Sequence, residues 1–260
     1  MINAFNLLGS GGYLGGNGFP NAVDFNGTSY LTKSGGFSSA VSSNAFIFSF
    51  WIKLNTSIIG TPYFLSMVNA AGNVEIIRLR FLSNTIIECR ITDEASASNF
   101  VQFQGIFATT IVNNWHHVLI RTVLSGTDTA DLQIYIDDVN ATDGLSWGGN
   151  GVSSIPYNAS GTVTIASFLG AGGTTMQDMC VAEAWIATTG IDTLTQEATR
   201  RKFIDTNKKP VKLGDNGQLP TGSVPLLYLS SDLATWNINK GYGGGMTVQG
   251  GALTQCGSRP

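Results

Sequence analysis

Residues 113–138 read NNWHHVLIRTVLSGTDTADLQIYIDD and predict two long strands joined by a turn. Apolar residues fall on both faces of the first strand, as expected for a strand buried inside a β-sandwich. The small and turn-forming residues of SGTDTAD interrupt this pattern. In the second strand, Leu132, Ile134 and Ile136 alternate with their neighbours. The stretch therefore predicts a hairpin with one filled inner face.

Further short strands are predicted on both sides of this hairpin. The most aromatic stretch, FIFSFWIKL at residues 46–54, is typical of a core strand. Residues 22–31, AVDFNGTSYL, predict a small hairpin around their Asn-Gly pair. Residues 145–159 are interpreted as an irregular loop. Other strands are expected at 63–68, 75–82, 85–91, 100–107, 162–169, 179–187 and 226–230.

Only one helix is predicted, in the stretch TLTQEATRRKFIDT. Thr193 and Gln196 fit a capping box at its start. The face that it would bury consists of Leu194, Ala198 and Phe203. With so many strands and one short helix, we expect an all-β fold of two antiparallel sheets packed as a jelly-roll sandwich.

Composition limits the classes of protein and of partner. A chain of 260 residues with 43% hydrophobic residues can bury one large core, so we expect one main domain. Only 12% of residues are charged and the net charge is -3, which argues against a nucleic-acid partner, because phosphate neutralisation needs clustered Lys and Arg. The basic residues at 200–202 and 208–209 are interpreted as a solvated face. No run of 18 apolar residues predicts a membrane span.

Glycine-rich segments flank the predicted sandwich, which we assign to residues 21–210. Residues 1–20 combine many glycines with large apolar residues, among them Phe5, Leu7, Leu8 and Tyr13. They predict an arm that lies on a partner or on the protein's own domain, with a disordered tail as the alternative. Residues 211–260 predict an extension that packs on the sandwich or on a partner, with a small separate module as the alternative.

The three cysteines are an odd number at wide spacing, namely Cys89, Cys180 and Cys256. None belongs to a zinc-like pair, and we interpret them as buried or free thiols of a chain folded in a reducing compartment. The first twenty residues lack the basic start and unbroken apolar run of a signal peptide. We therefore expect synthesis in the cytoplasm.

Several stretches, taken in order, carry a resemblance to a known family. They are AVDFNGTSYL, FIFSFWIKL, NNWHHVLIR followed by LQIYIDD, and MCVAEAWI followed by DTLTQEA. Together they span about residues 22–205 and resemble the laminin-G-like members of the concanavalin A-like lectin and glucanase superfamily. The segments LPTGSVPLLYLS and NKGYGGGMTVQGGALT resemble segments that follow such domains in tailed-phage and prophage proteins. The resemblance implies a fold, whereas function has to be argued from a site.

No catalytic constellation is predicted. The glucanases of this superfamily place closely spaced carboxylates along one strand, and no Glu-x-Asp-x-Glu stretch occurs here. Glu88 is separated from Asp93 and Glu94, and Glu183 stands alone on its strand, where the family carries a matching Glu.

The two histidines, His116 and His117, are adjacent, so on a strand they point to opposite faces and are interpreted as core residues. A Ser-His-Asp arrangement around His117 is the alternative, although no G-x-S-x-G stretch is present. We expect a protein that is not an enzyme.

Any ligand contacts are expected in the loops. Carbohydrate binding needs exposed aromatic faces, and rings in glycine-rich loops are the candidates, namely Trp147, Tyr157, Trp236 and Tyr242. The competing interpretation is that each ring packs its own loop onto the sandwich or onto a neighbouring subunit. No cofactor is expected. Because many family members bind calcium, the resemblance implies weak calcium candidates among the acidic residues, namely Asp24, Asp137, Asp138 and Asp143.

These observations favour a non-enzymatic virion structural protein of a tailed phage, either a head-decoration or a tail-associated component, made in the host cytoplasm without a signal peptide. Its glycine-rich ends would contact other virion proteins, and it would form a homo-oligomer with weak adhesion to host surface glycans. A free-standing carbohydrate-binding lectin module is the alternative. A polysaccharide-degrading enzyme that uses Glu88 or Glu183 is a third hypothesis.

Overall fold

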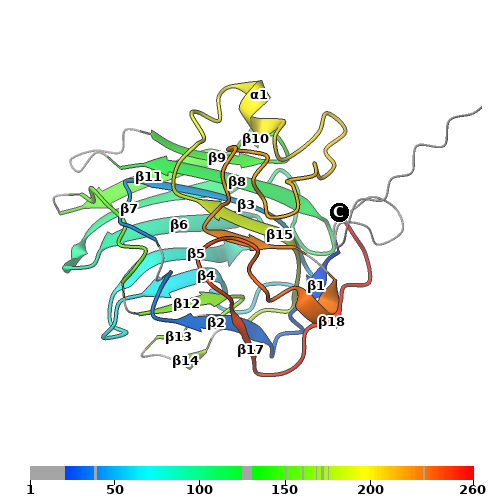
Figure 1. The fold of residues 1–260 in the computed structure, drawn as a ribbon, viewed down its shortest axis with the longest axis horizontal. Coiled ribbons are helices and arrows are strands. Elements are labelled where there is room, and N and C mark those ends of the chain that lie inside the picture. Colours follow the sequence, from blue (N-terminus) through cyan, green and yellow to red (C-terminus); the bar gives the residue numbers. More distant parts are fainter. Residues whose placement is uncertain are drawn as a thin grey trace, which may run out of the picture.

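Two antiparallel sheets pack face to face in the computed structural model of the chain (Figure 1). The structure describes residues 21–260 except 38–39, 125–130, 150, 160, 168, 171–172, 175 and 231, and it describes the backbone alone for 145, 147, 169–170 and 173–174. Residues 1–20, the predicted arm, lie outside the described part. Within that part each sheet has eight strands, which confirms the all-β jelly-roll sandwich expected from the sequence.

The first sheet contains the hairpin predicted at residues 113–138. Its spatial order is β10-β9-β8-β3-β15-β1-β18, with β16 also paired to β15. Residues 113–138 supply the hairpin strands β8 and β9, and Val118 lies opposite Ile136 in their register. The strands are β1 (Val23–Asp24), β3 (Ala45–Leu54), β8 (His116–Val123), β9 (Asp131–Ile136), β10 (Val139–Asn140), β15 (Met179–Ala187), β16 (Leu227–Leu229) and β18 (Thr254–Gln255).

The second sheet has the spatial order β11-β7-β6-β5-β4-β12-β2-β17. A separate two-stranded ribbon is formed by β13 (Leu169–Gly170) and β14 (Gly173–Thr174). The strands of the sheet are β2 (Tyr30–Ser34), β4 (Tyr63–Val68), β5 (Glu75–Ser83), β6 (Ile86–Asp93), β7 (Ser96–Ile106), β11 (Thr142–Gly148), β12 (Thr162–Ile165) and β17 (Thr247–Gln249).

The main core lies between the sheets and is rich in phenylalanine. Phe48 and Phe50 alternate along β3, so both point to the same face. The ring of Phe64 on β4 stacks on them, with its centroid 4.3 Å from that of Phe50. Aromatic pairs of this kind add to the free energy gained by burial. They hold the two sheets at a fixed separation.

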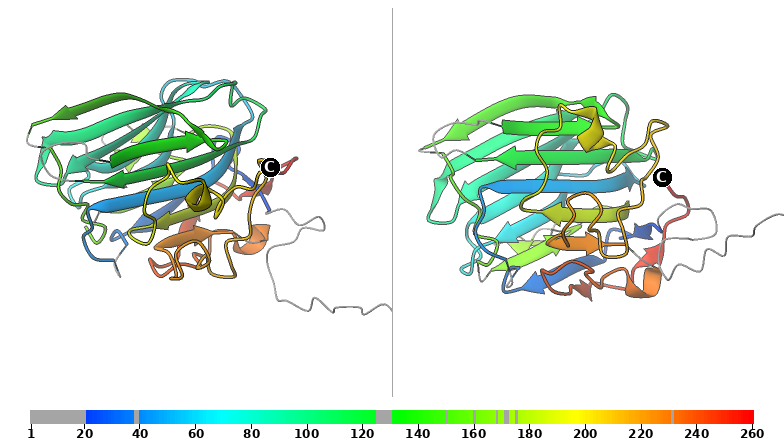
Figure 2. Two further views of the ribbon diagram at one scale, coloured as in Figure 1. Left: turned by 90° about the horizontal axis from the view of Figure 1, so that it is seen from above. Right: turned by 45° about the horizontal axis from the view of Figure 1, so that its top comes forward.

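A second apolar cluster covers the outer face of the first sheet. Trp185 of β15 and Phe203 meet edge to face there, and Leu213 packs beside them. The Trp185 indole donates a hydrogen bond of 2.8 Å to the carbonyl of Gly217. Figure 2 shows the segment between β15 and β16, which carries α1 (Glu197–Arg200), lying over this sheet. η1 (Leu233–Thr235) follows β16, and Leu233 packs against the main core. No helix of the described residues is long and apolar enough to cross a membrane.

The predicted hairpin at residues 22–31 is wrong. β1 pairs with β15 and β18 in the first sheet, whereas β2 pairs with β12 and β17 in the second. The Asn-Gly pair does form a tight turn, with positive φ angles at Asn26 and Gly27. The turn carries the chain from one sheet to the other, and Val23 of β1 and Leu31 of β2 are both buried in the core between the sheets.

The predicted helix is shorter than expected. Only Glu197–Arg200 is helical, and Gln196 is the N-cap without a side-chain capping bond. The Thr193 hydroxyl instead contacts the Gln133 side chain of β9 and the hydroxyl of Thr195. Leu194 and Phe203 are buried as predicted, but Ala198 is exposed. A tertiary contact has replaced the capping box.

Two of the three cysteines are not free thiols. Cys180 on β15 and Cys256 beyond β18 form a disulfide across 76 positions of sequence, which corrects the expectation of unpaired cysteines. Cys89 on β6 is a free, buried thiol.

The predicted loop at residues 145–159 begins inside β11, so its first residues are part of a strand.

The segment after residue 210 contributes edge strands to both sheets. β16 pairs with β15, β17 with β2 and β18 with β1. The glycine-rich close of the sequence is therefore part of the sandwich in the described residues.

Candidate functional site

The outer face of the second sheet carries a dense array of polar side chains. Along β5 and β6, apolar residues point into the core while Arg78, Arg80, Glu88 and Arg90 point outward, because successive side chains of a strand alternate between faces. The strand register aligns these residues in two rows across the sheet. One row is Arg78, Arg90 and Gln102, and the other is Arg80, Glu88 and Gln104. We call this surface the polar face.

Glu88 is the centre of an ion-pair network on the polar face. Its side chain is almost fully buried, at 2% exposure. The Nε atoms of Arg78 and Arg80 donate to its Oε1 at 3.0 and 2.7 Å. Arg78 also donates to Glu75 at 3.2 Å, and Glu75 accepts from the Tyr63 hydroxyl. A buried carboxylate with two guanidinium partners is held in one orientation.

A pocket of about 170 Å³ opens at the end of this network. Its polar lining is formed by Asn73, Glu75, Arg78, Arg90 and Thr92. These side chains combine amide, hydroxyl, carboxylate and guanidinium groups within one small volume. Such a mixture can donate to and accept from adjacent hydroxyl groups of a ligand.

Arg90 differs from the other arginines of the polar face. Its guanidinium lies 3.8 Å from the centroid of the Phe100 ring and donates to the Thr92 hydroxyl and to the Ala97 carbonyl. No carboxylate of the described residues lies within 4.0 Å of it. Burial, together with the positive charge of Arg78, lowers the pKa of Arg90. Arg90 therefore has a positive charge that no described carboxylate neutralises. It also has N–H donors beyond the two that bind Thr92 and Ala97.

Two of the four aromatic candidates for glycan contacts cannot stack on a sugar. Tyr157 and Trp236 are 0% exposed, which contradicts their predicted role. The Tyr157 hydroxyl donates to the Ala45 carbonyl at 2.6 Å, and Trp236 meets Phe25 edge to face. Both rings pack their loops onto the sandwich, as the competing interpretation proposed.

The other two aromatic candidates occupy separate parts of the fold. Tyr242 is 43% exposed and follows β16 by thirteen residues. Trp147 lies on β11 opposite Val101, and its side chain is outside the described part. The structure therefore does not bring the four rings together as one described binding surface.

Three of the four weak calcium candidates are engaged with protein groups. Asp24 shares the Asn55 amide with Asp178. Burial and the charge of Asp178 raise the pKa of Asp24, although its bond from the Asn26 amide opposes this. Among the described residues, no three His, Cys, Asp or Glu side chains are grouped to hold a metal ion.

The acidic candidates near β9 are scattered. Asp137 accepts from the His116 ring at 2.6 Å, and Asp143 lies opposite Gln104 at the start of β11. Asp138 binds both Arg200 and Arg201. The four acidic residues thus belong to different local contacts.

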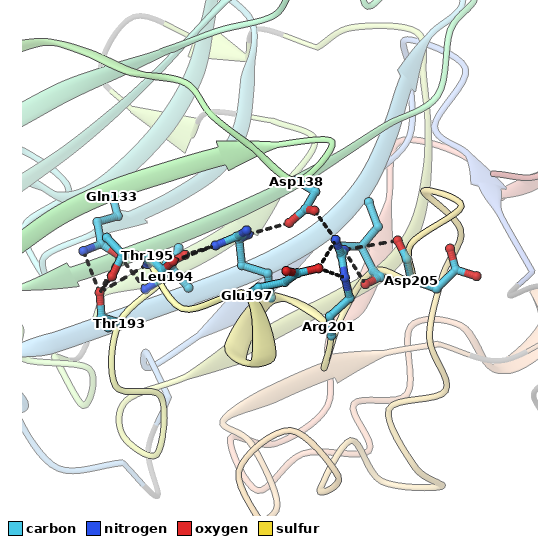
Figure 3. A network of polar contacts seen from close by, with 10 residues as sticks. Gln133, Asp138, Thr193, Leu194, Thr195, Glu197, Arg201 and Asp205 are labelled. Carbon is cyan, nitrogen blue, oxygen red and sulfur yellow. Dashed lines mark hydrogen bonds and ion pairs between the residues drawn. The ribbon is translucent and has the colours of Figure 1, made fainter.

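Asp138 belongs to the network that fastens the helical segment to the first sheet (Figure 3). Arg200 also donates to the Leu194 carbonyl at 2.6 Å and stacks on the Tyr135 ring. Arg201 donates to Glu197 and to the carbonyl of Asp205. The basic residues at 200 and 201 are therefore structural contacts and not a free solvated face.

The two histidines lie on opposite faces, as their adjacency predicts. The His116 ring is beside Phe107 of the main core, whereas the His117 ring is beside Trp51 of an outer cluster. His117 Nε2 is 2.9 Å from the Ser49 hydroxyl oxygen. Both side chains are buried, so a substrate could not reach this Ser-His pair.

Comparisons with known proteins agree with the fold. No family model matches the chain, and no curated protein matches it. The Bacteroides ovatus "putative carbohydrate binding protein" has a similar structure, with TM-score 0.55 and 13% identity over 92% of this chain. The chain spans 61% of that protein.

Two further solved structures have lower scores. Domains LG4-5 of the mouse laminin alpha1 chain give TM-score 0.45 and 9% identity, covering 65% of this chain and 41% of that one. The heptameric SAP-like pentraxin from Limulus polyphemus gives TM-score 0.42 and 16% identity, covering 68% and 79%. The two-sheet jelly-roll fold follows from the strand order and agrees with the Bacteroides ovatus structure, and no phage protein is among these three structures.

The polar face was missed as a site from the sequence, which pointed only to Glu88 as a catalytic alternative. A signal is nevertheless present. Arg-x-Arg at 78–80 and Glu-x-Arg at 88–90 place charges at period two in strands whose other face is apolar.

Proposed function

We propose that this protein is a non-catalytic carbohydrate-binding module whose ligand occupies the pocket of the polar face. The observation that carries the proposal is the set of converging donors and acceptors around Arg90, which has hydrogen-bonding capacity unused by the protein. Sugar hydroxyls both donate and accept, so they match a lining of amide, carboxylate and guanidinium groups. Phe100, held beneath the Arg90 guanidinium, adds an apolar element to this region.

The placement of the acidic residues supports binding without catalysis. A glycoside hydrolase needs two carboxyl groups on one face of the substrate. Glu88 is buried against two arginines on the second sheet, whereas Glu183 lies on the first sheet and accepts from the Tyr228 hydroxyl. The two side chains belong to different sheets, which argues against a shared reaction centre.

A glycan array with the full chain tests the proposal. We expect binding to at least one glycan, and a loss of affinity of about tenfold or more, roughly 1.4 kcal/mol, in Arg90→Ala and in Asn73→Ala. Lys212→Ala is the matched control, because it removes an exposed cation whose neighbour Leu213 packs on the first sheet. The proposal fails if the wild type binds no glycan, or if both pocket variants bind as tightly as the control.

The virion hypothesis remains a second candidate for the biological setting of this module. It rests on the glycine-rich residues 1–20 and on the resemblance of the tail segments to phage sequences. In this setting the protein would decorate a head or tail as a homo-oligomer, having been made in the host cytoplasm. Deletion of residues 2–20 should then abolish incorporation into particles, and normal incorporation would contradict the role of the arm.

A further inference from the structure

A second pocket lies away from the polar face, beside the point where residues 1–20 join the sandwich. Its volume is about 580 Å³, within the range of about 300–1,000 Å³ typical of ligand pockets. η1 forms one wall, and β17 with the chain leading to β18 forms another. The lining residues carry no charge and are Leu233, Ala234, Asn237, Val248, Gly251, Ala252 and Leu253. We call it the C-terminal pocket.

The start of the described chain is fixed next to this pocket. The Asn21 amide donates to the Asp232 carboxylate at 2.8 Å, and Asp232 directly precedes the pocket residue Leu233. The Ala22 carbonyl accepts from the backbone of Cys256 and from the Gln255 side chain. These bonds hold the junction with residues 1–20 at the rim of the C-terminal pocket.

The chemistry of residues 1–20 matches the pocket. The segment has no Asp, Glu, Lys or Arg, and it contains Phe5, Leu7, Leu8 and Tyr13. At about 3.3 Å per residue, the eight positions from Tyr13 to Asn21 can span up to about 26 Å, so reach does not limit docking. Tethering also raises the effective concentration of these side chains beside the pocket.

We propose that the C-terminal pocket binds apolar side chains of residues 1–20 of the same chain. The arm thereby covers Leu233, Val248 and Leu253, which are the largest apolar side chains of the lining. This docking is independent of carbohydrate binding, since no residue of the C-terminal pocket lines the pocket of the polar face.

Hydrogen exchange of the full chain, followed by mass spectrometry, tests the docking. In the wild type we expect amides within residues 5–14 to exchange at least about tenfold more slowly than in an unstructured peptide of the same sequence. Ala252→Trp fills the pocket and should return them to the unstructured rate, and Ala234→Trp should do the same from the opposite wall. Ala198→Trp, at an exposed alanine of α1, is the matched control and should leave protection unchanged.

Three results would overturn the proposal. One is exchange of residues 5–14 at the unstructured rate in the wild type. Another is full protection in both pocket variants while β3 and β8 keep their own protection, which shows that the fold is intact. The third is protection that disappears on dilution, because the pocket would then be filled by the arm of a second copy.

Discussion

His117 Nε2 lies 2.9 Å from the hydroxyl oxygen of Ser49, and both side chains are buried beneath the outer clusters of the first sheet. Burial lowers the pKa of His117 to about 4, although the charges of Asp137 and Asp138 oppose the shift. The native imidazole is therefore neutral at pH 7, and it has to remain neutral for its site to stay intact.

The free energy of unfolding should consequently fall in acid. The unfolded state binds a proton at His117 near pH 6.5 and the native state only near pH 4, so this contribution is fully present above about pH 6.5 and is lost as the pH falls through about 4. The difference between these two pKa values corresponds to roughly 3 kcal/mol of the free energy of unfolding. Urea unfolding at pH 7.5 and pH 4.5 should show this loss in the wild type and a smaller loss in His117→Gln. Equal losses would contradict the assignment.

The disulfide predicts a dependence of stability on reductant. Linking positions 76 residues apart restricts the unfolded chain by about 4 kcal/mol in the chain-entropy account. Dithiothreitol should therefore lower Tm in the wild type and leave Cys180→Ala/Cys256→Ala unaffected. Cys89→Ala is the control: it removes a buried thiol whose pKa is raised by burial, and its Tm should respond to reductant as the wild type does.

Trp236 and Tyr242 should respond in opposite ways to truncation. Trp236→Ala removes a buried ring and should destabilise the protein by about 3–5 kcal/mol, measured by chemical denaturation. Tyr242→Ala, at a partly exposed ring, should cost much less. Trp236→Phe tests the indole separately, because its Nε1 has no hydrogen-bond partner within the described residues. A Trp236→Ala variant of unchanged stability would show that the ring is not a core residue.

The network around Asp138 should control local opening of the helical segment. Burial alone would raise the pKa of Asp138, but the hydrogen bonds and charges of Arg200 and Arg201 outweigh it and lower the pKa. Asp138→Asn should weaken the attachment by about 1–2 kcal/mol. Hydrogen exchange of residues 194–205 should then become faster while β3 stays protected. Glu197→Gln is the control, because Glu197 is 64% exposed and contacts only one of the two arginines.

The positions of the core strands could be predicted because they depend on local runs of apolar residues. Residues 46–54 and 179–187 are such runs, and both form long strands of the first sheet that are buried on both faces. Which strands pair with one another was harder to predict from the sequence. The Asn-Gly turn at 26–27 is a strong local signal, but it does not determine which sheet receives the second strand.

The site was harder to predict than the fold for two physical reasons. The polar face depends on register across β5, β6 and β7, which no single strand reveals. Glycine-rich surroundings also suggested that Trp236 and Tyr157 are exposed. At Gly243, however, an added Cβ would lie 2.5 Å from the Leu226 carbonyl oxygen and 2.7 Å from the Phe37 ring. Glycine is needed there because the backbone is closely packed and not because the loop is open.

The edges of the two sheets limit how another chain could extend them. In the described part of the chain, β10 and β18 end the first sheet and β17 ends one side of the second, with only two or three residues each. Short edge strands leave few unpaired backbone groups for strand addition. β16, which pairs only with β15, is a further edge of the first sheet and has three residues. The other edge of the second sheet, β11, has seven residues and a register irregularity between Asp143 and Ser146. Among the edge strands of the two sheets in the described residues, β11 therefore offers the longest backbone for a partner that joins the sandwich by β-augmentation.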